Sequence, residues 1–341
     1  MIRFGSTPSA PLGFSHRKGK RYLRARRAGR ATLIEVFAET FTPQARPLLG
    51  VVVVVCFILA SSASASNAAV GHAAKGWWLG WEPAHVVNGS PILFKVVPPV
   101  RLESLAGTWM DHPVFFSFDP RTKLWFGIAG VSLETPAGKF VLTLQGKTAA
   151  GQEVSFVERL AISQGRYRQI VLRVPKQFTE PTPEQREQIR QEQVLKQEVF
   201  SRIDPKREWS GVFLPPVRAS ITDVFGTARV FNGATQSLHT GLDYGVPSDT
   251  PVVALNQGTV LLARPLFFEG NCVVLNHGQG LLTLYMHLSK MEVKEGDHVL
   301  RGQEIALSGG TGRATGPHLH VAVRWEGIYL NPATLLSLPF P

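Results

Sequence analysis

Five side chains near the end of the sequence have types and spacings that suit metal-assisted hydrolysis. His239 and Asp243 lie four residues apart, and on a strand these positions face the same way because the side-chain period is two. His318 and His320 lie two residues apart and share a strand face by the same rule, and His287 ends a hydrophobic stretch. Zn²⁺ binds imidazole nitrogens and carboxylate oxygens in proteins. The spacing therefore predicts a zinc site formed by His239, Asp243 and either His318 or His320.

A catalytic zinc site needs three protein ligands and further groups that handle protons. The metal polarises a scissile carbonyl and lowers the pKa of water, while the spare imidazoles can take protons or stabilise negative charge near neutral pH. Glycines within 309–317 let the backbone approach such a site closely. This loop lacks the ending of a phosphate loop, and no helix is expected after it. The pattern therefore favours peptide hydrolysis. The alternative is a binding protein with a sandwich fold, in which the histidines have no catalytic role. This alternative requires the His239–Asp243 pair, His287 and the His318–His320 pair to occur together by chance.

Alternation of apolar and polar residues predicts that short β-strands position these side chains. Near the site the expected strands are 251–263, 271–278, 281–288 and 318–325. Upstream, Gly and Pro separate further stretches with the spacing of a sandwich: 91–97, 113–118, 123–130, 139–146 and 168–174. The chain is therefore expected to be mainly β.

A polar stretch separates the two strand-rich regions and predicts a helix. Thr182 and Pro183 are favourable at a helix start, and Gln185 is placed to complete a capping box. The expected organisation has a leader (1–66), an N-terminal β-sandwich-like domain (75–178), a helical connector (179–208) and a β-rich C-terminal domain (209–341).

The charge of the chain is concentrated at its start. The formal net charge is +11, yet residues 1–47 hold ten Lys or Arg and two acidic residues, which leaves 26 basic and 23 acidic residues elsewhere. A nucleic-acid partner is therefore not expected. An apolar run over 47–60 and a small-residue stretch follow, as in a secretory signal. We expect export to the periplasm or cell envelope, with membrane contact only through this signal or an uncleaved anchor.

The sequence contains two cysteines, Cys56 and Cys272. Cys56 lies within the apolar run and would leave with a cleaved signal. Cys272 would then have no partner for an intramolecular disulfide, and we expect a small buried hydrophobic residue on a strand.

Three motifs taken together resemble the LytM/lysostaphin-type zinc metallopeptidases: H-x-x-x-D, Y-x-H-L-S and G-x-T-G-x-x-T-G-P-H-L-H. These are peptidoglycan endopeptidases with the duplicated hybrid motif fold, and the resemblance covers about 211–335. It implies one zinc ion per chain, held by His239, Asp243 and His320. It also implies that His287 and His318 are the catalytic histidines. The upstream strands resemble the β-domain that precedes the peptidase in some secreted members.

The resemblance implies a substrate among the peptide stems or cross-bridges of bacterial cell walls. Some members cut glycyl bonds and others cut D-alanyl–diaminopimelate cross-links. A β-domain without a recognisable wall-targeting module favours the second type. The alternative is a catalytically silent regulator of other wall hydrolases, but all five motif positions are filled. A further hypothesis is autoinhibition, in which the connector places the first domain over the metal groove.

Overall fold

The computed structural model describes residues 70–74, 76–233 and 235–341. All of them belong to one compact unit, Ser62–Pro341, and the predicted leader (1–66) lies outside the described residues. Within the described ranges, strands far outnumber helices, which confirms the mainly β prediction. None of the helices in these ranges has the length and apolar character needed to cross a membrane.

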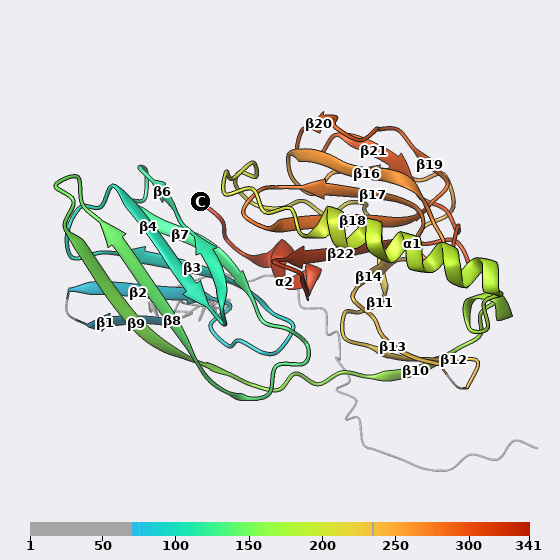
Figure 1. Ribbon diagram of the computed structural model, residues 1–341, viewed down its shortest axis with the longest axis horizontal. Helices are drawn as coiled ribbons and strands as arrows, with labels where there is room; N and C mark the ends of the chain where they lie inside the picture. Colours follow the sequence, from blue (N-terminus) through green and yellow to red (C-terminus); the bar gives the residue numbers. More distant parts are fainter. Residues whose placement is uncertain (1–69, 75, 234) are drawn as a thin grey trace, which may run out of the picture. The chain divides into compact units, whose positions relative to one another are not determined.

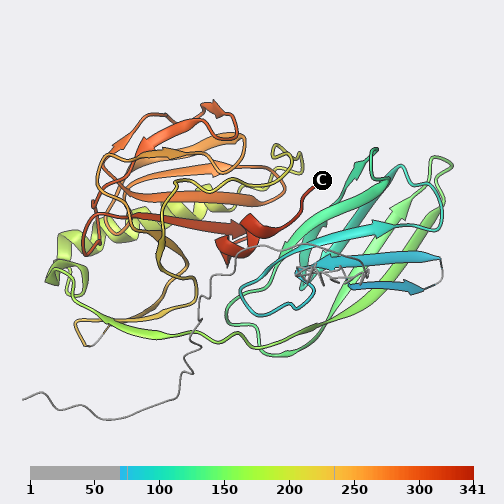
Figure 2. The same cartoon turned by 180° about the vertical axis from the view of Figure 1, so that it is seen from behind.

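The N-terminal domain consists of two antiparallel sheets (Figure 1; Figure 2 gives the opposite view). Trp77 stacks on Phe156 with ring centroids 5.6 Å apart, and Phe94 meets Trp109 edge to face, so aromatic rings join the two layers. One sheet has the order β1 (Val70–Ala74), β2 (Trp77–Glu82), β3 (Pro91–Val97), β7 (Leu124–Gly130) and β6 (Ser117–Asp119). The other has the order β5 (His112–Phe115), β4 (Ser104–Trp109), β8 (Gly138–Lys147) and β9 (Glu153–Ile162).

The segment 168–174 is a strand, but the expectation that it pairs within the N-terminal sandwich was wrong. Strand β10 (Gln169–Leu172) pairs in parallel with β12 (Ala228–Phe231), which pairs in turn with β13 (Thr235–Leu238). The alternation of apolar and polar residues predicts a strand, but it does not determine which other strand it pairs with. Here Val174 packs with Phe178 and Phe231 in a small apolar cluster, and this contact holds the segment against β12.

The connector forms the expected helix. A short 3₁₀ turn (η1, Lys176–Phe178) precedes α1 (Pro183–Phe200). The Thr182 side chain accepts a hydrogen bond from the Gln185 backbone, and the Gln185 side chain accepts one from the Thr182 backbone, which completes the capping box. Helix α1 lies along the large C-terminal sheet (Figure 1), where Val199 packs with Leu262 and Leu282.

An eight-stranded sheet forms the core of the C-terminal domain. Cys272 is buried on one of its strands, as expected, and burial raises the pKa of its thiol. The order is β11 (Ile221–Asp223), β14 (Gly241–Tyr244), β22 (Leu319–Trp325), β18 (Leu281–Leu288), β17 (Gly270–Asn276), β16 (Gly258–Leu266) and β20 (His298–Val299), with β23 (Ile328–Leu330) beside β22. A smaller sheet contains β15 (Pro251–Val253), β21 (Glu304–Leu307) and β19 (Lys290–Met291), and α2 (Pro332–Ser337) follows β23.

Candidate metal centre

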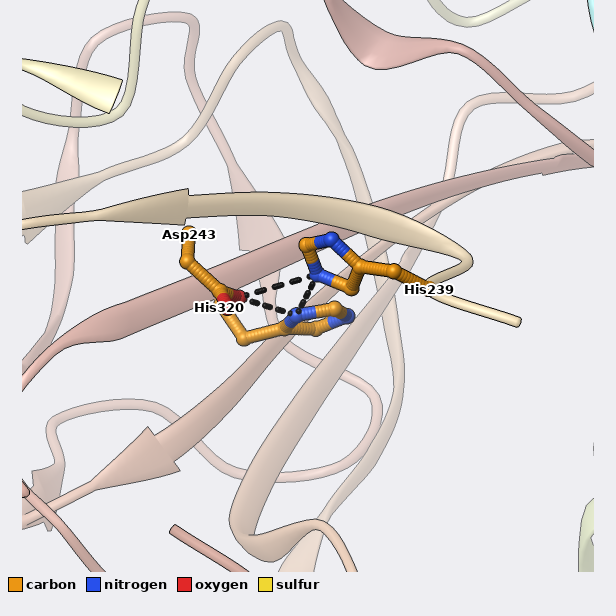
Figure 3. A group of neighbouring side chains, drawn as sticks. All are labelled: His239, Asp243 and His320. Carbon is orange, nitrogen blue, oxygen red and sulfur yellow. Dashed lines mark hydrogen bonds and ion pairs between the residues drawn. The ribbon is translucent and has the colours of Figure 1, made fainter. Parts of the chain in front are cut away.

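Two neighbouring strands of the large sheet present the first two candidate ligands. Asp243 on β14 lies directly opposite His320 on β22, so both side chains leave the sheet on the same face. His239 comes from the two-residue connection between β13 and β14, and its ring points at the other two side chains (Figure 3). The expectation that His239 and Asp243 share one continuous strand was therefore wrong, because the strand is interrupted at 239–240, where the chain passes from the three-stranded sheet to the large sheet. The two side chains nevertheless lie together.

The three side chains converge on a single point. The Nε2 atom of His239 lies 3.0 Å from Oδ1 of Asp243 and 3.0 Å from Nδ1 of His320, and the last two atoms are 2.7 Å apart. All three residues are buried. One nitrogen or oxygen atom from each can therefore contact the same small ion.

The protonation of His239 favours a bound cation. Its Nδ1–H donates to the carbonyl oxygen of Val224 at 2.8 Å, and a carbonyl can only accept. The Nε2 atom of the neutral ring then carries a lone pair that faces the Asp243 carboxylate. Two acceptors at this separation repel unless a cation lies between them. Two imidazoles and one carboxylate form a donor set that suits a divalent metal ion. The residues therefore fit the zinc ion that we expect from the sequence.

Burial keeps the candidate ligand His320 neutral. It lowers the pKa of His320 to about 4, despite the hydrogen bond and charge of Asp243, which raise it. Burial by itself would raise the pKa of Asp243, but its close contacts with the rings of His239 and His320 hold it well below its usual range. A neutral imidazole and an ionised carboxylate are the forms that ligate metals.

A network of charged side chains contacts Asp243 on the side away from the two histidines. Arg229 donates to Oδ2 of Asp243 and, through Nε at 2.9 Å and Nη2 at 2.6 Å, to Asp223. Asp223 also accepts from Arg168 at 2.6 Å and from Thr227 at 2.9 Å. Sequence reasoning gave these residues no role. The only signal in the sequence was that Asp223 and Arg229 lie in short strands just before the H-x-x-x-D motif.

The glycine of the H-x-x-x-D element makes room for a ligand. A Cβ atom on Gly241 would lie 2.6 Å from Nε2 of His320 and 2.3 Å from the carbonyl oxygen of Val321. A side chain at this position would therefore displace either the ring or the neighbouring strand. The motif requires glycine here for packing.

An irregularity in β18 turns His287 toward the centre. The Tyr285–Val273 and Leu288–Asn271 pairs differ in register by one residue. His287 lies within this bulge and has a φ of 60°, a left-handed conformation that is rare for a residue with a side chain. Bulges re-aim side chains and are common next to active sites. Simple alternation would have placed His287 on the opposite face from the ligands.

Backbone carbonyls fix the protonation of both additional histidines. Nδ1–H of His287 donates to Thr311 and that of His318 donates to Gly316, each at 2.8 Å. Each neutral ring therefore keeps Nε2 as an acceptor. The two ring centroids are 4.8 Å apart, and Nε2 of His318 lies 3.8 Å from Oδ1 of Asp243. Burial and the neighbouring histidines lower the pKa of His287 to about 3.

The glycine-rich loop brings its carbonyl groups close to the site. Gly312 has a φ of 71°, and a Cβ there would lie 2.3 Å from the backbone nitrogen of Gly270. The loop therefore passes the start of β17 at backbone contact distance. This contact holds the carbonyl of Thr311 against His287.

The two remaining histidines of this domain lie outside the centre. His277 is buried, donates to the carbonyl of Gln257 and contacts Thr283 at 2.8 Å, so its role is structural. His298 is largely exposed beside Glu208. The structure thus brings together the five predicted site residues and separates them from the other two histidines.

A groove with a volume of about 300 Å³ adjoins the centre. It reaches Asp243, His287 and His318, and one wall comes from β10 and the residues just after it. Its lining residues from this wall and from β12 are Arg168, Ile170, Leu172, Val174, Arg229 and Phe231, and the glycine-rich loop contributes Arg313, Thr315, Gly316 and Pro317. A peptide lying in this groove would pass the metal ligands.

Comparisons with known proteins agree with this geometry. The model of peptidase family M23 matches residues 237–332. The peptidoglycan DD-endopeptidase ShyA of Vibrio cholerae is 51% identical over 93 residues, which are 27% of this chain and 22% of ShyA. The DD-carboxypeptidase/endopeptidase Mpg of Neisseria meningitidis is 43% identical over 127 residues, 37% of this chain and 29% of Mpg. The chain therefore spans less than a third of the length of these relatives.

A solved structure extends the similarity beyond the matched region. The crystal structure of a candidate M23 peptidase from Pseudomonas aeruginosa has a TM-score of 0.56 and 27% sequence identity. The similarity covers 73% of this chain and 94% of that one. The fold similarity thus includes more than the region that carries the motifs.

Proposed function

Because residues 237–332 form a peptidase family M23 domain, we propose that this protein is a zinc-dependent endopeptidase that hydrolyses the peptide cross-links of bacterial peptidoglycan. The observation that carries the proposal is the convergence of His239, Asp243 and His320 beside two histidines with fixed Nδ1 protons. Relatives named as peptidoglycan endopeptidases support the substrate class.

Each side chain has a distinct part in the proposed reaction. Zinc held by the three ligands would polarise the scissile carbonyl and lower the pKa of water. His287 is neutral at physiological pH, so its Nε2 can accept a proton from the attacking water. That proton must then reach the departing amine nitrogen, and Nε2 of His318, which also lines the groove, can accept it and pass it on. Arg229 holds the second oxygen of Asp243 and keeps the ligand oxygen in place.

The proposed substrate requires that the protein act outside the cytoplasm. The basic segment and apolar run at the start of the sequence support export, because they follow the order of a secretory signal. We therefore propose that the protein works in the periplasm or cell envelope.

Digestion of purified muropeptide dimers tests this function. The dimers should contain either a D-alanyl–diaminopimelate cross-link or a glycyl bridge, and mass spectrometry should follow their conversion to monomers. We expect cleavage of the first type by the zinc-loaded protein. Intact dimers of both types would contradict the proposal, and cleavage of glycyl bridges alone would correct the substrate.

A further inference from the structure

Three arginines line the groove beside the metal centre, and two of them are already engaged. Arg168 and Arg229 both donate to Asp223, and Arg229 also donates to Asp243. Arg313 donates no side-chain hydrogen bond and forms no ion pair within residues 70–74, 76–233 and 235–341. Of the three guanidinium groups, Arg313 is the one left for an anion from outside.

Aromatic rings hold Arg313 in place. Its guanidinium carbon lies 4.6 Å from the ring centroid of Phe231 and 4.7 Å from that of Phe268. Stacking of this kind engages the faces of the planar group and leaves its N–H edges able to bind a carboxylate in a bidentate manner. The acidic neighbour Glu269 is itself bound to Lys196 at 2.7 Å. Arg313 is therefore pre-oriented and half-buried.

The backbone places Arg313 close to the reacting atoms. It lies on the loop whose Thr311 and Gly316 carbonyls accept from the two catalytic candidates, His287 and His318. Arg313 and His287 line both hollows that flank the metal ligands. A peptide bound across the centre would therefore pass the guanidinium near its scissile bond.

Apolar side chains of the β10 segment also line the groove. Ile170, Leu172 and Val174 project from the β10 segment beside Phe231. Such a wall gains contact area from peptide side chains and gains little from glycine. The apolar residues of the β10 segment and the guanidinium group of Arg313 together suit a peptide that has apolar side chains and a carboxylate.

We propose that Arg313 is a specificity residue that binds a carboxylate of the substrate peptide, so that the groove selects carboxylate-bearing stem peptides over neutral ones. This inference rests on the proposed function, whose substrate it narrows. A bidentate, charge-assisted pair in a half-buried site contributes about 10- to 100-fold in affinity. Lysine would replace it only in part, because a single ammonium group carries the charge but lacks the planar fork.

Calorimetry on the full zinc-loaded chain tests the inference independently of turnover. The probes are a diaminopimelate-containing tetrapeptide stem with free carboxylates and the same stem with amidated carboxylates. We expect the unmodified protein to bind the free form about 10- to 100-fold more tightly. Arg313→Met keeps a side chain between the two rings and should abolish this preference. Arg313→Lys should restore only part of it.

Arg324→Met provides a matched control. Arg324 is also stacked between two rings, Phe200 and Tyr329, but it does not line the groove. This variant should keep the preference for the free stem. Equal affinity of the unmodified protein for both stems would overturn the inference. So would an equal loss of affinity for both stems in Arg313→Met, because a structural role would weaken both. Failure of the proposed function would instead appear as intact dimers in the cleavage assay.

Discussion

The metal centre and the β10 wall of the adjoining groove differ in how their side chains are held. In the centre, His239, Asp243 and His320 are buried. The carbonyl of Val224 binds the His239 ring, and Arg229 binds the Asp243 carboxylate. In the wall, Ile170 and Leu172 are only half-buried and present apolar surface to open space. The first arrangement suits a small ion that needs fixed geometry, whereas the second suits a longer ligand that needs contact area. Substitutions should therefore have sharply different effects in the two regions.

The largest effect is expected from removing a ligand. His239→Ala should lose bound zinc and lose activity by at least about 1,000-fold, because two ligands do not hold the ion in a catalytic geometry. Metal content by atomic emission and dimer cleavage by mass spectrometry measure both losses. The exposed His298 provides the control, and His298→Ala should keep one zinc ion and full activity. One equivalent of zinc in His239→Ala would remove that residue from the ligand set.

A separation between metal binding and turnover is expected at His287. His287→Ala should retain one zinc ion and lose about 100- to 10,000-fold in kcat, the range for removing a general acid or base. Single-turnover cleavage combined with metal analysis would show the split. Unchanged kcat would exclude His287 from the mechanism.

The support behind the ligands should contribute less than the ligands themselves. Arg229→Met leaves one oxygen of Asp243 without its partner and should weaken zinc affinity by about 10- to 100-fold. Competition with a chelator of known affinity measures this change. Arg168→Met is the matched variant, because Arg168 contacts Asp223 and not Asp243. Equal losses in the two variants would show that the network acts as a whole and not through Asp243.

The smallest effect is expected in the groove wall. Ile170→Ser removes one apolar contact and should raise KM by about 3- to 10-fold with kcat unchanged. Val171, its neighbour on β10, is 70% exposed and lies outside the groove lining, so Val171→Ser should leave KM unchanged. A large fall in kcat or in bound zinc in Ile170→Ser would show that the wall and the centre are not independent.

The two regions also differ in how far the sequence predicts them. The ligands lie in short motifs, and the register of β14 with β22 brings Asp243 beside His320. The structure brings His239 to Asp243 and His320, but the geometric reason for expecting this was wrong, because the strand is interrupted at 239–240. The position of His287 could not follow from periodicity, because a bulge and a left-handed φ reverse its face.

The groove wall could not be predicted from motifs at all. Strand β10 lies about 70 residues before His239 in the sequence, and its pattern shows only that it is extended. Its partner is determined by tertiary packing, in which Val174 meets Phe231. The contacts of Arg229 with Asp223 and Asp243 were not predicted for the same reason, since they depend on how distant strands pack. Local patterns identify ligands, whereas distant packing determines what surrounds them.

A zinc titration of the metal-free protein tests the central claim most directly. Bound metal and cleavage of cross-linked muropeptide dimers should be measured in the same samples. We expect no cleavage without metal, a cleavage rate that rises in proportion to bound zinc, and saturation of that rate at one equivalent per chain. Each cleavage should convert a dimer into two monomers with uptake of one water molecule. Cleavage by metal-free protein, or intact dimers at one bound equivalent, would contradict the account.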